Sequence, residues 1–155
     1  MNKGSKKLIF DEIRQDWVRA TPEEIVRQQW LKRLTHQLGF PRELIAVEKK
    51  LKELPHLNCS EVPDRRLDIL SYGKEAAPSC SLFPLLLIEC KDETLSEDAV
   101  NQVIGYNHHV KAPFIAAVNL EEVHFGTFDR SENKYIFRSF LPSFKELMQW
   151  VNRKL

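Results

Sequence analysis

The chain has 155 residues, of which 43% are hydrophobic and 29% charged, a composition typical of an ordinary folded domain. Its 23 Lys and Arg residues against 22 Asp and Glu residues leave a net charge of +1, which excludes a strongly basic surface for nonspecific nucleic-acid binding. No apolar run reaches the roughly 18 residues of a membrane span, and residues 1–7 are polar and basic without a signal-peptide core, so we expect a cytoplasmic protein without a membrane segment.

The cysteines and the chain length indicate one domain in a reducing compartment. Cys59, Cys80 and Cys90 form no CxxC pair, so a zinc site is not expected. A chain of this length can bury one core, and it contains no internal repeats or low-complexity tracts. We expect residues 1–20 to be an N-terminal extension that is free to be flexible, and residues 21–155 to form a single domain.

The first predicted element is a helix over residues 21–38. Thr21 can cap its N-terminus, Pro22 suits its first turn, and Gly39 can end it. The apolar positions of this first helix recur at the spacing of one buried face. A short strand or helix entry is expected around residues 44–48.

Two apolar runs with acids at mirrored ends follow, over residues 65–70 and 85–91. Both runs are typical of buried strands, and the turn-rich segment 71–84 between them favours an antiparallel hairpin. A hairpin that turns between Pro78 and Ser79 places Asp68 opposite Glu89. The sequence therefore predicts two carboxylates side by side on neighbouring strands.

The alternation of side chains adds a lysine to this pair. Glu89 and Lys91 share one face of their strand, while Ile88 and Cys90 point to the other. Two adjacent carboxylates next to an apolar core are costly unless a cation neutralises them, and a hard divalent ion does this well. A nearby lysine can hold a water molecule or offset charge on a phosphate, which suits phosphodiester hydrolysis.

Ordinary strand-end charges are the alternative interpretation. Asp68 could pair with Arg65 or Arg66, and Glu89 with Lys91, without any ligand.

Asp68 followed by Glu89-x-Lys91 resembles the PD-(D/E)xK nuclease signature, and the surrounding sequence resembles the N-terminal nuclease domain of type I restriction enzyme R subunits. The further blocks that carry this resemblance are Val26-Arg27-Gln28, Leu38-Gly39-Phe40-Pro41, Val47-Glu48 and Gln102-x-x-x-Tyr106. The resemblance fades near Val118-Asn119, where the family's Asn-Gly is replaced by Asn119-Leu120. It implies an α/β fold of the restriction-endonuclease type, with a central mixed β-sheet flanked by helices.

The resemblance also implies roles for individual residues. Asp68 and Glu89 would bind Mg²⁺, with Mn²⁺ as a substitute, and the backbone carbonyl of Cys90 would be a further ligand. Lys91 would assist the attacking water. Gln102 and Tyr106 would line the side of the site that faces DNA.

Two further acids need separate treatment. Glu48 matches an acid that some relatives place near the metal, although a solvated charge beside Lys49 and Lys50 explains it equally well. Asp64 completes a literal Pro-Asp dipeptide, but it precedes two arginines in an expected loop. Asp68 is preferred because it begins the apolar strand and pairs with Glu89.

A helix from about residue 94 to 110 tests the assignment of Gln102 and Tyr106. Thr94 and Glu97 offer a capping box at its start. Because residues four apart share a helical face, Gln102 and Tyr106 should stack, with His109 nearby. The apolar stripe of Val100, Val103 and Ile104 is expected on the far side.

The remaining elements complete a sheet covered by helices. Residues 113–118 form an apolar run that should be a strand parallel to the Glu89 strand, because a helical crossover joins them. Residues 123–128 and 134–140 alternate around a turn and predict a second hairpin. A last helix is expected from Ser143.

The patterns suit phosphodiester hydrolysis, and the resemblance implies a standalone metal-dependent endonuclease or exonuclease domain that acts on DNA. The sequence lacks a GxxxxGK[ST] phosphate loop, so we expect a protein partner to supply motor function or DNA affinity. Arg65, Arg66, Lys91 and Lys111 can provide a local basic patch.

Two other classes of function stay open. One is a catalytically silent module on the same fold that binds nucleic acid or protein. The other is a structural subunit, which would show a large exposed apolar patch around Trp17, Trp30 or Trp150.

Overall fold

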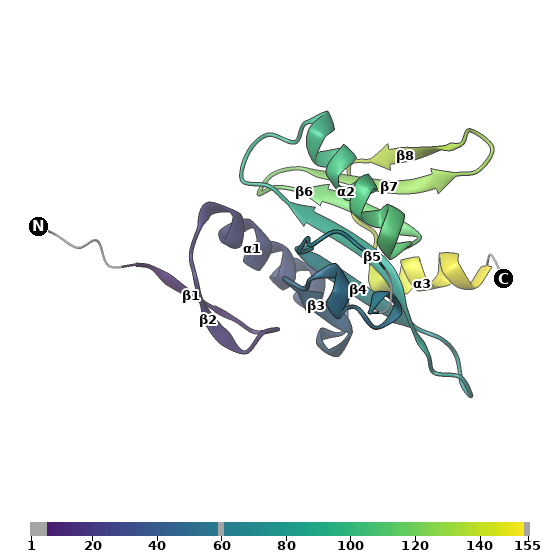
Figure 1. Cartoon of the computed structure of the whole chain (residues 1–155), viewed down its shortest axis with the longest axis horizontal. Coiled ribbons are helices and arrows are strands. Elements are labelled where there is room, and N and C mark those ends of the chain that lie inside the picture. The colour runs from purple at the N-terminus through teal and green to yellow at the C-terminus, as the bar shows by residue number, and fades with distance from the viewer. Residues whose placement is uncertain (1–5, 59–60, 154–155) are drawn as a thin grey trace, which may run out of the picture.

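The computed structural model describes residues 6–58 and 61–153, and a six-stranded mixed sheet forms its centre (Figure 1). Neighbouring strands run antiparallel except for the parallel pair β5 and β6. The central mixed sheet flanked by helices is the predicted architecture. In spatial order the strands are β3 (Ile45–Val47), β4 (Ile69–Lys74), β5 (Leu82–Cys90), β6 (Phe114–Val118), β7 (Val123–Asp129) and β8 (Lys134–Arg138).

Helices cover both faces of this sheet and bury two apolar clusters. On one face, α1 (Pro22–His36) and α3 (Phe144–Arg153) pack against alternate residues of the strands, such as Ile88 and Phe114. On the other face, α2 (Glu97–Val110) packs against the residues between them, such as Leu87 and Ile115. The short 3-10 turns are η1 (Arg42–Leu44), η2 (Leu51–Glu53) and η3 (Pro55–Leu57).

The β4–β5 hairpin has the predicted register at its open end. Ile69 lies opposite Ile88, and continuing this register by one residue places Asp68 opposite Glu89. The strands pair farther toward the turn than expected, because Lys74 lies opposite Leu82 after a bulge between Ser71 and Tyr72. The connecting turn is therefore shorter than residues 71–84.

Gly73 allows this tight pairing near the turn. A Cβ atom at Gly73 would lie 2.4 Å from the Phe83 ring and 2.9 Å from the sulfur of Met148. Only a residue without a side chain leaves space for both groups. The packing of Phe83 and Met148 over the strand thus extends the hairpin beyond the apolar runs.

Helix α1 begins and ends close to the predicted residues. The Thr21 hydroxyl accepts a hydrogen bond from the Glu24 backbone N–H at 3.2 Å, and Gly39 adopts a positive φ of 73° after the last turn.

The start and the buried face of α2 differ from the prediction. Ser96 caps the helix instead of Thr94, with its hydroxyl 3.4 Å from the Ala99 backbone N–H. The buried positions are Ala99, Val103, Asn107 and Val110, whereas Val100 and Ile104 are only partly buried.

Asn107 explains why the apolar pattern misplaced this face. Its side chain donates to the Ala112 carbonyl and accepts from the Ala112 backbone N–H, both at 2.8 Å. It also donates to the Tyr135 hydroxyl at 3.1 Å. A polar side chain whose hydrogen bonds are satisfied in this way can occupy a buried position, and hydropathy alone does not reveal it.

The N-terminal segment contains a hairpin that the sequence did not predict, formed by β1 (Leu8–Asp11) and β2 (Asp16–Arg19) and lying beside α1 (Figure 1). Its link to α1 is Asp11, which is fully buried and accepts a hydrogen bond from the Gln28 side chain at 2.9 Å. Trp17 in β2 is 62% exposed.

The described residues include no helix long and apolar enough to cross a membrane. Cys90 is buried and Cys80 is exposed, both as free thiols. Cys59 lies outside the described residues.

Candidate metal centre

Asp68 and Glu89 lie together where β4 begins and β5 ends. Both are buried, with 3% and 5% of their surface exposed. One carboxylate oxygen of Asp68, Oδ2, accepts a hydrogen bond from the Cys90 backbone N–H at 2.7 Å, so Asp68 is tied to the residue that follows Glu89. The Cys90 side chain points into the core on the opposite face, as strand alternation predicted.

Lys91, Gln102 and Tyr106 form a hydrogen-bonded group around Glu89. The Lys91 ammonium is 3.6 Å from Glu89 Oε1 and donates to Gln102 Oε1 at 2.6 Å. The Gln102 amide donates to Glu89 Oε1 at 3.2 Å and to the Tyr106 hydroxyl at 3.1 Å. The stacking of Gln102 and Tyr106 follows from their spacing on α2, which places both residues beside the end of β5.

Glu89 is electrostatically the more unusual of the two acids. Burial and the neighbouring Asp68 carboxylate together raise the pKa of Glu89 to about 9, although Lys91 opposes the rise. Its second oxygen, Oε2, is buried and has no hydrogen-bond partner among the described residues. A carboxylate in this position gains more from a cation than one already paired within the protein.

Arg27 is the important residue of this region to which sequence reasoning gave no role. It is buried in α1, and its Nη2 atom donates to Asp68 Oδ1 and to Glu48 Oε1, each at 2.6 Å. Its Nη1 atom donates to Glu24. Burial lowers the pKa of Arg27, but Asp68, Glu48 and Glu24 together raise it above its ordinary value.

The position of Arg27 decides the surroundings of Glu48 and Asp68. The Glu48 backbone N–H donates to the Asp68 carbonyl at 3.0 Å, so the two residues are neighbours, but the Glu48 carboxylate is held by Arg27. The expected alternative partners of Asp68 do not fill this role. Arg66 donates instead to the Glu48 carbonyl at 3.0 Å, and Asp68 pairs with Arg27.

A sequence signal for Arg27 existed in the helical spacing. Arg27 and Gln28 lie four and three residues before Leu31, Glu24 lies one further step of three or four residues before them, and all four share the buried face of α1. Charged residues on a buried face need partners, but the sequence could not say that the partners lie on β3 and β4.

The same buried network reaches the N-terminal hairpin. Arg14 donates to Asp11 at 2.6 Å and also contacts Glu24, which Arg27 contacts from the other side. Asp11, Arg14 and Glu24 thus link the hairpin to the arginine that holds Asp68.

The donor atoms fit a hard divalent cation. Asp68 and Glu89 offer carboxylate oxygens, and Glu89 Oε2 is buried without a partner. Across residues 6–58 and 61–153, no three His, Cys, Asp or Glu side chains form a ready metal-binding group. The Arg27 guanidinium, rather than a metal ion, lies between the Glu48 and Asp68 carboxylates.

Asp64 is placed away from the pair. Its side chain is 82% exposed and lies 3.8 Å from the Lys50 ammonium. The literal Pro-Asp dipeptide is therefore not part of the acidic pair.

The three tryptophans considered for the exposed apolar patch of a structural subunit differ in exposure. Trp30 is 3% exposed and belongs to the core, where its indole N–H donates to the Asn119 carbonyl at 2.7 Å. Trp150 is half-buried and Trp17 is exposed. Trp30 therefore cannot belong to the exposed apolar patch that a structural subunit would show, because the apolar face of α1 packs on the sheet.

Comparison with known proteins places residues 22–142 on the family model described as the type I restriction enzyme R protein N terminus. A solved fragment assigned as an HsdR subunit of a type I restriction enzyme from Vibrio vulnificus YJ016 shares the fold, with a TM-score of 0.54 and 17% sequence identity. The match covers 85% of this chain but 25% of that one, so this chain spans about a quarter of its length. No curated protein matches.

Proposed function

Because this chain belongs to the family of type I restriction enzyme R protein N termini, we propose that it is a metal-dependent nuclease domain that hydrolyses phosphodiester bonds in DNA. The observation that carries the proposal is the group formed by the buried Asp68 and Glu89 and the partly exposed Lys91, with Gln102 hydrogen-bonded to both Lys91 and Glu89. Arg27 pairs with Asp68, but Glu89 has only the partly exposed Lys91 as a nearby cation, which is an expensive arrangement for structure alone.

The ion would be held by the Asp68 and Glu89 carboxylates and by the Cys90 backbone carbonyl. Mg²⁺ suits these oxygen donors, and Mn²⁺ is a usable substitute. When bound, such an ion polarises the phosphate and lowers the pKa of a coordinated water. Glu48 would be an additional acid near the ion, held at a fixed position by Arg27.

Lys91 would act on the reacting groups directly. Its side chain is 22% exposed, so it borders solvent while its ammonium lies 3.6 Å from Glu89 Oε1. An ammonium in this position can orient a water molecule or stabilise negative charge that develops on the phosphate. Gln102 fixes the direction of the ammonium through the hydrogen bond at 2.6 Å. Tyr106, linked to Gln102, lies beside them.

DNA affinity in this proposal is local and weak. The net charge of +1 supplies no general attraction, but Arg65 and Arg66 are exposed next to Asp68. A protein partner would supply further affinity or motor function. We place the protein in the cytoplasm, where its free thiols would stay reduced.

A catalytically silent module is the second candidate, and one observation favours it. Arg27 already occupies one oxygen of Asp68 and holds Glu48, so the acids are partly neutralised without a metal. In that case the fold would serve to bind nucleic acid or protein.

Cleavage assays separate the two candidates. Supercoiled and single-stranded DNA are incubated with Mg²⁺ or Mn²⁺ and the wild type, Asp68→Asn, Lys91→Ala or the control Lys145→Ala, a change on the exposed side of α3. We expect nicking by the wild type and the control, no nicking by Asp68→Asn, and about 100-fold slower nicking by Lys91→Ala. Thermal melting confirms that each variant is folded. Equal rates for wild type and Lys91→Ala would refute the role of Lys91, and an inactive wild type would favour the silent module.

A further inference from the structure

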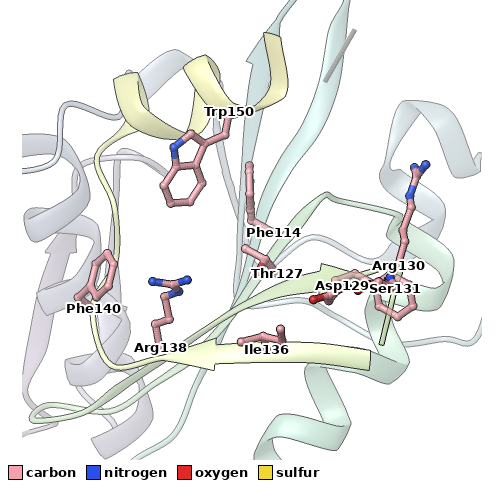
Figure 2. A pocket seen from close by; sticks show the side chains of 10 residues that line it. Phe114, Thr127, Asp129, Arg130, Ser131, Ile136, Arg138, Phe140 and Trp150 are labelled. Carbon is pink, nitrogen blue, oxygen red and sulfur yellow. Dashed lines mark hydrogen bonds between the residues drawn. The ribbon is translucent and has the colours of Figure 1, made fainter. Parts of the chain in front are cut away.

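A hollow of about 740 Å³ lies over β7 and β8, on the face of the sheet that α1 and α3 cover elsewhere (Figure 2). Figure 2 shows Trp150 on one side of it and Ile136 and Arg138 on the other, with Phe140 and Arg130 at its two ends. We call this hollow the β8 groove. None of the residues assigned to the metal centre lines it.

The groove exists because α3 covers only part of its face of the sheet. The Trp150 ring of α3 reaches Phe114 and Phe125, with ring centroids 5.9 and 6.4 Å apart. Strand alternation places Ile136 and Arg138 on this same face, opposite Thr127 and Phe125. They lie beyond the helix, and Ile136 remains 38% exposed.

The walls of the groove carry aromatic rings that are open to a ligand. Phe140, which follows β8, is 51% exposed, and Trp150 is half-buried. Flat rings at the edge of an open hollow are surfaces on which an unpaired base can stack.

The charges of the groove are unbalanced toward cations. Arg130 and Arg138 are exposed, and neither has an acidic partner or a side-chain hydrogen bond within the described ranges 6–58 and 61–153. The lining acid is Asp129, whose Oδ1 accepts from the Ser131 hydroxyl and from the backbone N–H groups of Ser131 and Glu132. Two free guanidinium groups against one locally bonded carboxylate favour an anionic ligand.

We propose that the β8 groove binds single-stranded nucleic acid, with a base against Trp150 and Phe140 and a phosphate on Arg138. Arginine binds phosphate through paired N–H donors, and aromatic rings stack on exposed bases of any sequence. A duplex presents its bases only at their edges, so it cannot use the aromatic walls in the same way. The volume is in the range of sites that hold a molecule the size of a nucleotide.

The groove and the metal centre lie on different faces of the sheet. Phe114 at the start of β6 lines the groove, whereas Val118 at the other end of β6 accepts a hydrogen bond from the Lys91 backbone N–H at 2.9 Å. Gln102 and Tyr106 belong to α2, which covers the opposite face. A nucleic-acid strand bound in the groove therefore occupies a different site from the nucleic acid that would be cleaved at the metal centre. The inference rests on the proposed function only in the choice of DNA as the polymer.

Binding without cleavage tests the proposal. Fluorescence anisotropy of a labelled oligothymidylate of about 12 nucleotides is measured with the full chain in EDTA, for the wild type, Arg138→Gln and Phe140→Ala. Arg19→Gln is the matched control, because it removes the same charge from an exposed position on the N-terminal hairpin. We expect each groove variant to raise Kd about tenfold, and the control to change it less than twofold.

The outcomes separate this proposal from the proposed function. Unchanged affinity in both groove variants overturns it, and so does equal binding of a duplex of the same length. If gel filtration shows a dimer that Phe140→Ala dissociates while DNA binding is unaltered, the groove is an interface between copies and the proposal is rejected. Groove-dependent binding by a wild type that never cleaves DNA would reject the nuclease function and leave this inference standing.

Discussion

Asp68 and Glu89 lie side by side, but their surroundings neutralise them in different ways. Asp68 accepts hydrogen bonds from Arg27 and from the Cys90 backbone, so both of its oxygens are occupied. Glu89 has Gln102 and Lys91 near one oxygen, and its other oxygen is buried without a partner in the described chain. A buried protein cation, Arg27, therefore pairs directly with Asp68, whereas Glu89 has only the more distant and partly exposed Lys91. An external cation has most to offer on the Glu89 side.

The Asp68 side continues into a closed network of buried charges. Arg27 holds Asp68, Glu48 and Glu24, and Arg14 connects Glu24 to Asp11. Every acid in this network has a cationic partner, which is the condition for keeping charges buried. On the Glu89 side the ammonium of Lys91 is partly exposed and shared with Gln102.

Removing Arg27 should have the largest effect, because it would erase the difference between the two sides. We expect Arg27→Met to lower the free energy of unfolding by about 3–5 kcal/mol, since three carboxylates lose a buried partner. Urea denaturation measures the change. Arg42→Met is the matched control, because the Arg42 pair with Glu12 is 2.8 Å long but exposed, and it should cost less than about 1 kcal/mol. Similar losses in both variants would show that Arg27 is not a special partner of the acids.

The pH dependence of stability should report the Glu89 side. Burial raises the pKa of Glu89 from its ordinary 4.5 to about 9, so the folded metal-free protein keeps a proton that the unfolded chain loses. Stability must then fall as the pH rises between these values. At about 1.4 kcal/mol per pH unit, the titration of Glu89 lowers the free energy of unfolding by up to about 3 kcal/mol from pH 6 to pH 8.

Glu89→Gln removes this titration. Urea denaturation in EDTA at pH 6 and pH 8 should show a smaller loss for the variant than for the wild type. Asp68→Asn should also reduce the loss, because the Asp68 carboxylate contributes to the raised pKa of Glu89. Identical pH profiles for wild type and Glu89→Gln would show that the pKa of Glu89 is not raised in the folded protein.

Metal binding should have the smallest effect on the free energy of unfolding, and it tests the difference between Asp68 and Glu89 directly. At an Mg²⁺ or Mn²⁺ concentration of about ten times Kd, the folded state gains about 1.4 kcal/mol, which corresponds to a rise in Tm of about 3–5 °C. The rise should be larger at pH 8 than at pH 6, because the ion must displace the proton of Glu89. Differential scanning fluorimetry measures both values.

Two asparagine variants serve as the controls for metal binding. Asp68→Asn should abolish the rise in Tm, whereas Asp64→Asn should keep it, since Asp64 is exposed and lies near Lys50. A rise that survives in Asp68→Asn but disappears in Asp64→Asn would place the ion elsewhere and refute the assignment.

The sequence predicted the parts of the site that depend on regular local geometry. The register that pairs Asp68 with Glu89 followed from a hairpin, and the contact of Gln102 with Tyr106 followed from helical spacing. The family assignment was also predicted, from short blocks in the expected order, and the family match over residues 22–142 confirms it.

The parts that were missed depend on contacts between distant segments. Nothing in the sequence of α1 indicates that Arg27 meets Asp68, because 41 positions separate them and the packing of α1 on the sheet brings them together. The N-terminal hairpin was missed for a related reason, since polar contacts connect it to α1, among them those of Asp11 with Gln28 and of Arg14 with Glu24. The buried face of α2 was misplaced because Asn107 is satisfied by Ala112, in the turn that follows the helix.

The sequence by itself determined the three helices, the pairing of β4 with β5, β5 with β6 and β7 with β8, and the residues that carry the proposed chemistry, because backbone periodicity is local and repeats along the chain. Tertiary structure alone decided which cation each acid meets. Arg27 neutralises Asp68 and Glu48, Glu89 keeps an unpartnered oxygen, and the short reach of α3 leaves the β8 groove open. Charge and burial act through space, so their balance is set by how the elements pack.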